Sequence, residues 1–188
     1  LSLPPDAPVL LVVGRLIASK QHQLLFNAME EVVAAYPDAL LLVVGDGGQD
    51  QDTVRDAARS SKVSRHIRME GFISDPLSHY QAADLLVSPS QVEGLSNVVL
   101  EAMACGLPTL LHDACGNRDV IDHEVDGVVT ELDSVERLAG AIKGLLGDPD
   151  QLAAYGQRAR DKVKTSFSLQ SMAAAYETTY RGLANGRP

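Results

Sequence analysis

Short runs of apolar residues alternate with amphipathic stretches along the first two thirds of the chain. Runs that are apolar throughout predict strands buried on both faces: Val9–Val13, Leu40–Val44, Leu85–Val87 and Thr109–Leu111. Weaker patterns predict further strands at His66–Met69 and Gly127–Thr130. Helical patterns lie between them, at Gln21–Tyr36, Asp50–Ser60, Pro76–Ala83 and Asn97–Cys105. Alternating strands and helices imply an α/β fold with a parallel sheet covered on both faces.

The last third of the chain has a different pattern. From Ser134 onward it predicts almost only helices, at Val135–Leu146, Asp150–Thr165 and Gln170–Leu183. We therefore expect a sheet domain followed by a helical C-terminal tail.

Length and composition fit one domain. The 188 residues, 45% of them hydrophobic, can bury a real core. There is no signal segment and no apolar run long enough to span a bilayer, so we expect a soluble chain. Because it begins at Leu1 rather than Met, we also expect a segment of a longer protein.

Charge and cysteine content exclude several classes of function. A net charge of -9, with 4% aromatic residues and no Trp, argues against a nucleic-acid-binding surface. The two cysteines, Cys105 and Cys115, indicate neither a disulfide framework nor a zinc site. A reducing compartment is therefore the default expectation. The histidines are scattered without metal spacing, so no metal is predicted.

Polar residues follow several of the predicted strands. In an open parallel sheet these loops share the carboxyl edge, where ligands bind. Arg15 and Lys20 follow the first strand after Gly14, and a guanidinium with an ammonium suits a diphosphate, although loop cations are often only solvated. Gly45–Gly48 lacks the spacing of a phosphate loop and is better interpreted as a tight turn.

Glu93 and Glu101 bracket a predicted loop-to-helix junction. Ser96 or Asn97 is the expected N-cap, and the first amides of a helix form a site for anions. Glu101 is placed to accept hydrogen bonds from vicinal hydroxyls such as those of a ribose, and Glu93 would reach another part of the same ligand. An acid near a helix start is also explained by the helix dipole alone.

Four segments in order resemble the donor half of retaining group 1 (family 4) glycosyltransferases. They are Val13–Lys20, Val43–Gly47, Gly71–Asp75 and Glu93–Pro108, and the last is the most specific. The resemblance implies the Rossmann-like C-terminal lobe of a GT-B enzyme and a nucleotide diphosphate sugar as ligand. In this family the final helix, here Gln170–Leu183, crosses toward an N-terminal acceptor lobe.

The resemblance also implies roles for individual residues. Arg15, Lys20 and Glu93 would be catalytic, the two cations on the diphosphate and Glu93 on the transferred sugar. The donor would also contact a set of binding residues: Gly14, Phe72, Ile73, Gly94, Leu95, Ser96, Asn97 and Glu101. The base would meet the backbone at Phe72 and Ile73, and the ribose would meet Glu101. No metal or cofactor would be needed, since the nucleotide sugar is a substrate.

One segment departs from the family pattern, which often has paired glycines where this chain has Ala114–Asp119. The resemblance implies a cytoplasmic enzyme, at the membrane face if the acceptor is a lipid-linked glycan, and a lobe that is inactive alone. The alternatives are a non-catalytic nucleotide-sugar-binding or regulatory lobe and a GT-B epimerase. A GT-B phosphorylase shares the two-lobed architecture but would need a lysine that carries pyridoxal. Neither the phosphorylase nor the epimerase has this pair of glutamates with the sequence between them.

Overall fold

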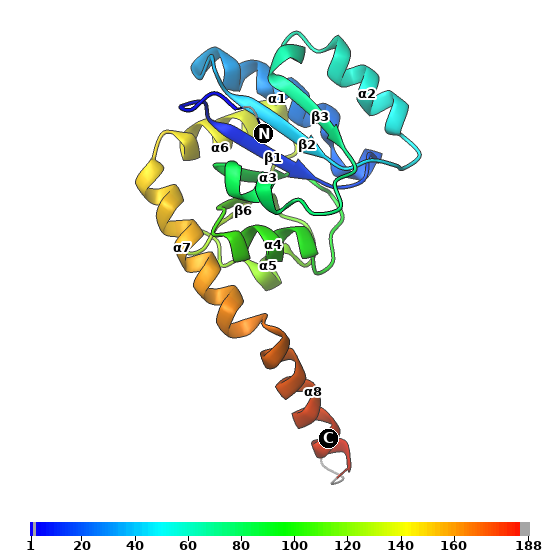
Figure 1. Cartoon of the computed structure of the whole chain (residues 1–188), viewed down its shortest axis with the longest axis vertical. Coiled ribbons are helices and arrows are strands. Elements are labelled where there is room, and N and C mark those ends of the chain that lie inside the picture. The colour runs from blue at the N-terminus through cyan, green and yellow to red at the C-terminus, as the bar shows by residue number, and fades with distance from the viewer. Residues whose placement is uncertain (2, 185–188) are drawn as a thin grey trace.

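The computed structural model describes residues 1 and 3–184 and shows a sheet with helices on both faces (Figure 1). The strands are β1 (Val9–Val13), β2 (Leu40–Val44), β3 (Ile67–Gly71), β4 (Leu85–Ser88), β5 (Thr109–His112) and β6 (Val128–Thr130). They form one six-stranded sheet in the order β3-β2-β1-β4-β5-β6, and all neighbours are parallel. The predicted parallel sheet is confirmed.

The apolar runs are continuous because both faces of the central strands are buried. β1 and β2 pair without a break from Val9 with Leu40 to Val13 with Val44. Successive side chains point to opposite faces. Leu10 packs into the core on one face of the sheet, and Leu11 packs into the core on the other.

Two sets of helices cover the two faces. The first core is closed mainly by α1 (His22–Ala35), α2 (Gln51–Ser60) and α6 (Val135–Leu146). The second is closed by α3 (Leu77–Ala82), α4 (Asn97–Cys105), the short α5 (Asn117–Val120) and α7 (Pro149–Ser166). The helices that follow β1 and β4 therefore lie on opposite faces.

Element boundaries differ from the predicted ones by one or two residues, with physical reasons at two points. Gln21 is outside α1 because its φ of 56° places it in the left-handed region. It follows a 3-10 turn, η1 (Ala18–Lys20). His66 is not in a strand: it ends a second 3-10 turn, η2 (Ser64–His66), and its ring Nδ1 lies 2.9 Å from the carbonyl oxygen of Ala39. The sequence pattern did not predict η1, η2 or α5.

The helical tail has one packed helix and one exposed helix. α7 lies close against α4, since a Cβ on Gly156 would stand 2.0 Å from the carbonyl oxygen of Gly106. The last helix, α8 (Leu169–Ala184), extends away from the sheet domain (Figure 1) and has no buried residue. Among the described residues, no helix is both long and apolar enough to cross a membrane.

Candidate functional site

The strand order places the topological switch point of the sheet between β1 and β4. These strands are neighbours, but the chain leaves them toward opposite faces of the sheet, so their loops diverge at the carboxyl edge. The loop after β1 carries Gly14, Arg15 and Lys20, and the loop after β4 carries Glu93 to Ser96. Most of the predicted site residues therefore lie in or beside these two loops, which we call the switch-point site.

Hydrogen bonds and an ion pair join the two loops of the switch-point site directly. The amide of Gln91 donates to the carbonyl oxygen of Ser19 at 2.9 Å. The fully buried Ser90 donates its hydroxyl to the same oxygen at 3.3 Å. Lys20 Nζ forms an ion pair with Glu93 Oε1, so two of the three residues predicted to be catalytic are in direct contact.

Arg15 is held by its backbone while its side chain stays exposed. The ring Nε2 of His22 lies 3.2 Å from the Arg15 carbonyl oxygen. Burial lowers the pKa of His22, which favours the neutral imidazole. The Arg15 side chain borders a 470 Å³ hollow and has no partner within the described part of the chain, so its guanidinium is available to a ligand.

The glycines after β2 serve close backbone packing. The interpretation of Gly45–Gly48 as a tight turn is confirmed, since Gly45, Gly47 and Gly48 all have positive φ. A Cβ on Gly45 would stand 1.9 Å from the carbonyl oxygen of Gly14. This contact sets the position of the Gly14 turn.

The first turn of α4 lies beside the loop that carries Glu93 and has no side-chain cap. The helix begins at Asn97, and Ser96 is its N-cap, as one of the two predicted alternatives had it. The Ser96 side chain makes no capping hydrogen bond, so it leaves the first amides of the helix for another acceptor. Gly94, Leu95 and Asn97 are exposed beside it, and the dipole favours an anion at this end.

Glu101 lies one turn further along α4 and does not contact Glu93. Its Oε2 accepts a hydrogen bond of 2.7 Å from the hydroxyl of Tyr80 on α3. Desolvation, followed by the contact with Glu101, raises the pKa of Tyr80. Tyr80 could not be identified from the sequence, because an apolar helical pattern does not reveal which group a phenol hydroxyl contacts.

The loop after β3 places Phe72 and Ile73 differently. The amide of Gly45 donates to the carbonyl oxygen of Gly71 at 2.7 Å, which ties this loop to β2. The Phe72 side chain is 76% exposed. Ile73 packs against the core beneath α3 and α4. At the carboxyl edge, the ring of Phe72 is therefore exposed, and the backbone beside it is held in place because the Ile73 side chain packs into the core.

The segment Ala114–Asp119 reaches the switch-point site through a single glycine. Gly116 has φ of +91°, and a Cβ there would stand 2.5 Å from the carbonyl oxygen of Gly94. The backbone after β5 thus packs on the loop that carries Glu93. This contact was also missed, because nothing in the sequence shows that the two glycines meet.

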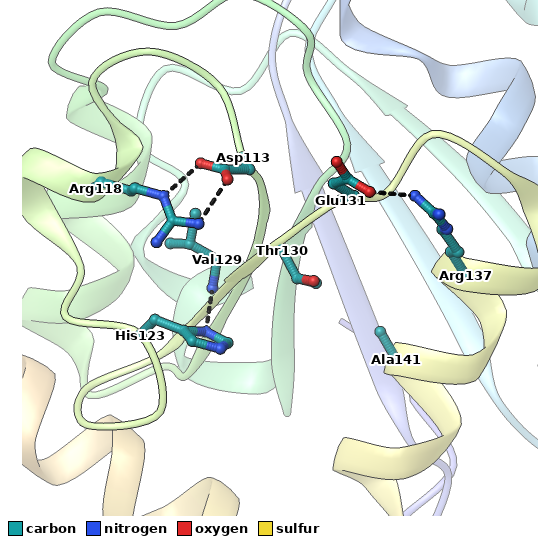
Figure 2. A pocket seen from close by; sticks show the side chains of 8 residues that line it. All are labelled: Asp113, Arg118, His123, Val129, Thr130, Glu131, Arg137 and Ala141. Atoms are coloured by element: carbon teal, nitrogen blue, oxygen red, sulfur yellow. Dashed lines mark hydrogen bonds and ion pairs between the residues drawn. The ribbon is translucent and has the colours of Figure 1, made fainter.

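A second hollow lies over the ends of β5 and β6 (Figure 2), and we call it the β5–β6 groove. It has a volume of 540 Å³ and is lined by Asp113, Arg118, His123, Val129, Thr130, Glu131, Arg137 and Ala141. Arg118 donates two hydrogen bonds of 2.6 Å to Asp113, which lowers the pKa of that carboxyl group. Arg137 pairs with Glu131 and Asp133. None of the predicted site residues lines this groove.

Metal ligands do not gather in the part of the chain that the structure describes. Within residues 1 and 3–184, no group of three or more His, Cys, Asp or Glu side chains is placed to hold an ion.

A parallel sheet in this strand order, with helices on both faces, defines a Rossmann-like class of domain. Residues 1–162 match the family described as glycosyl transferases group 1, and the chain belongs to this family. The predicted family and the predicted fold, a C-terminal GT-B lobe with a helical tail, are both confirmed.

Two curated relatives show the extent of the similarity. A GDP-mannose-dependent monoacylated alpha-(1-6)-phosphatidylinositol monomannoside mannosyltransferase of Corynebacterium glutamicum is 33% identical, over 92% of this chain and 46% of the relative. A D-inositol 3-phosphate glycosyltransferase of Segniliparus rotundus is 32% identical, over 99% of this chain and 42% of the relative. The chain thus spans about half the length of the curated relatives that it matches.

Solved structures share the fold. Sucrose-phosphate synthase from Thermosynechococcus elongatus superposes with a TM-score of 0.87 at 28% identity, covering 98% of this chain and 47% of that chain. A C-terminal domain of a group 1 glycosyl transferase, LpcC from Francisella tularensis, superposes with a TM-score of 0.75 at 24% identity, covering 89% of both chains. The Anabaena protein HepE in complex with UDP has a TM-score of 0.82 at 22% identity, covering 93% of this chain and 49% of that chain.

Proposed function

We propose that this chain is the donor-binding half of a retaining glycosyltransferase and binds a nucleotide diphosphate sugar. The observation that carries the proposal is the Lys20–Glu93 ion pair across the switch point, beside the first turn of α4. The names of similar proteins support a nucleotide sugar: a relative is GDP-mannose-dependent, and HepE has been crystallised with UDP-glucose.

The charges of the site suit the bond that would break. As the glycosidic bond cleaves, negative charge grows on the diphosphate leaving group. Arg15, Lys20 and the amides around Gly94–Asn97 would stabilise that charge, because preorganised donors act most strongly where charge develops. Lys20 has three donors, so it can bind a phosphate while it still holds Glu93 toward the sugar. We propose that these groups replace a metal ion and that no cofactor is needed.

The rest of the donor would extend along the carboxyl edge of the sheet. Glu101 would accept hydrogen bonds from the ribose hydroxyls, and the base would contact the backbone at Phe72 and Ile73. Support comes from their positions: Glu101 is exposed one turn inside α4, and Phe72 and Ile73 lie directly after β3.

Nucleotide binding tests this assignment directly. We expect isothermal titration calorimetry to detect weak binding of UDP or GDP by the chain, and we expect Glu101→Gln to weaken it. Arg137→Ala in the β5–β6 groove is the control and should leave binding unchanged. If wild-type chain binds neither nucleotide diphosphate, the proposed site is wrong.

Kinetics of the longer protein test the role of Arg15. We expect Arg15→Ala to lower kcat far more than it raises the donor KM, because the charge that Arg15 meets develops late in the reaction. Equal losses in kcat and in donor binding would argue against a transition-state role and for simple donor affinity.

The exposed helix α8 supports a second part of the proposal, an N-terminal lobe of the same protein that binds the acceptor. Large apolar side chains recur on one stripe of this helix with exposures of 51–80%, at Leu169, Met172, Tyr176, Tyr180 and Leu183. We propose that this lobe covers the stripe, since the relatives are about twice as long as this chain. The chain alone would then transfer no sugar.

Paired variants distinguish a docking stripe from a helix that is simply solvated. In the longer protein, the double variant Tyr176→Ser, Tyr180→Ser should lower the melting temperature and the activity, while the melting temperature of the 188-residue chain stays the same. Thr178→Ala changes the opposite face of α8 and serves as the control. Equal effects on the chain and the longer protein would refute the docking proposal.

The acceptor and the cellular location follow from the relatives by analogy. We propose a cytoplasmic enzyme that works at the membrane face on a sugar or a lipid-linked glycan, because relatives are named for phosphatidylinositol mannosides. The longer protein should then transfer labelled sugar into the lipid extract of its source cells. Transfer only to water-soluble acceptors would overturn this part.

A further inference from the structure

Tyr80 is buried, but its hydroxyl bonds to an exposed side chain of the neighbouring helix α4. The residue is 3% exposed, and its ring packs in the core that α3, α4 and α7 close over the sheet. From there the hydroxyl donates a 2.7 Å hydrogen bond to Glu101 Oε2 on the neighbouring helix. A rigid core group thus holds one oxygen of an exposed side chain.

The direction of this hydrogen bond is fixed by chemistry. Burial raises the pKa of Tyr80, so the phenol keeps its proton at neutral pH. The phenol donates this hydrogen bond, and the carboxylate oxygen accepts it. Within the described residues no other group bonds to Glu101, which leaves Oε1 and the remaining lone pairs of Oε2 for a ligand.

Holding the Glu101 carboxylate in one position changes which ligands it can distinguish. A free glutamate side chain loses rotamer freedom when it binds a pair of hydroxyls, whereas a glutamate already held in place loses less. A fixed acceptor also discriminates more strongly against a ligand that lacks one hydroxyl, because the unmatched polar group cannot turn elsewhere. The geometry therefore supports ribose selectivity as well as affinity.

We propose that Tyr80 is a positioning residue for ribose recognition: it holds Glu101 so that the site prefers ribonucleotides to deoxyribonucleotides. This inference rests on the proposed donor site, in which Glu101 meets the ribose. Tyr80 itself does not touch the ligand, so it acts only through Glu101.

The test compares Tyr80→Phe with a matched variant elsewhere. Tyr80→Phe removes one oxygen and keeps the ring in the core. Tyr36→Phe also removes a hydroxyl donor, the one that reaches the carbonyl oxygen of Lys143 at 3.3 Å, outside the switch-point site. Calorimetry on the chain with UDP, GDP and their 2′-deoxy and 3′-deoxy forms gives both affinity and selectivity.

We expect Tyr80→Phe to weaken binding of the ribonucleotide about 3–10-fold, which is less than the roughly tenfold or greater loss for a direct hydrogen bond to a charged group, because Tyr80 acts only through Glu101. The preference for ribose over deoxyribose should fall with it, and Tyr36→Phe should match wild type in both. In a double-mutant cycle, Tyr80→Phe should add nothing when Glu101 is already Gln, because the two residues act as one unit.

The outcomes separate this inference from the proposed function. If wild-type chain binds no nucleotide diphosphate, or if Glu101→Gln changes nothing, the donor site and this inference both fail. If Glu101→Gln removes ribose selectivity but Tyr80→Phe leaves it intact, the donor site stands and Tyr80 has no positioning role. Additive effects in the cycle would show that Tyr80 acts through packing alone.

Discussion

The switch-point site and the β5–β6 groove lie at the same edge of one sheet, yet they are built in opposite ways. At the switch point, the groups that meet come from distant parts of the chain, as Lys20 with Glu93 and Ser19 with Gln91. In the groove, charged groups pair with near neighbours in sequence, as Asp113 with Arg118 (Figure 2). The groove, at 540 Å³, is larger than the 470 Å³ hollow beside Arg15.

The volume of a hollow therefore does not show whether distant parts of the chain meet there. A local ion pair forms wherever a loop turns back on itself, and when exposed it contributes little. A contact between two loops that follow different strands exists only because the sheet brings those strands together. This is why we propose that the donor binds at the switch point and not in the groove, although the groove is the larger of these two hollows.

Removing one cation from each region should give the largest contrast. We expect Lys20→Met to lower turnover of the longer protein by about 10²–10³-fold, the usual cost of losing one donor to a developing charge. Arg137→Met removes one cation from the groove and should leave turnover unchanged. Steady-state rates of nucleotide release measure both. A comparable loss of turnover in Arg137→Met would indicate that the reaction takes place in the groove.

The point where the two regions touch provides the next test. Gly116 follows β5 and packs on Gly94, and an added Cβ would stand 2.5 Å from the Gly94 carbonyl oxygen at a φ of +91°. We expect Gly116→Ala to destabilise the chain by roughly 1–3 kcal/mol through backbone strain and to weaken nucleotide binding. Urea denaturation and calorimetry measure the two effects.

Gly140 is the matched control, because it lies within α6 and an added Cβ there meets nothing within 4 Å. Gly140→Ala should stabilise the chain by roughly 0.5–1 kcal/mol, the usual gain within a helix. If Gly116→Ala behaved like Gly140→Ala, the contact with Gly94 would not constrain the site.

The sheet could be predicted from the sequence because its signals are local. Leu40–Val44 is apolar at every position since both of its faces are buried, and that pattern is visible without the fold. The start of α4 at Asn97 was likewise predicted from its own residues. His66 was wrongly placed in a strand because its apolar neighbours do not reveal the 3-10 turn that precedes β3.

The contacts within the site are long-range, so only some could be predicted. Strand-end logic placed Lys20 and Glu93 at one edge but did not show that they pair. Tyr80 was missed because its bond to Glu101 depends on how α3 packs against α4. Local patterns thus predicted that Lys20 and Glu93 follow strands at the same edge of the sheet, and the fold was needed to show which side chains contact one another.

The smallest expected effect concerns the groove itself. Arg118 holds the pKa of Asp113 below its ordinary value of 3.8, so the pair stabilises the folded state wherever the carboxyl is ionised. This contribution is fully present above the ordinary pKa and is lost as the pH falls through the lowered pKa. Asp113→Asn should therefore reduce the free energy of unfolding slightly at pH 7, and the difference from wild type should vanish in acid.

Urea denaturation of wild type and Asp113→Asn at a series of pH values checks the sign. Asp38→Asn is the control, because Asp38 is exposed and forms no ion pair within residues 1 and 3–184. Its difference from wild type should not show the same decline. Nucleotide affinity should be equal in all three proteins at pH 7. If Asp113→Asn weakened nucleotide binding while Asp38→Asn did not, the groove would belong to the donor site, and the contrast between the two regions would be wrong.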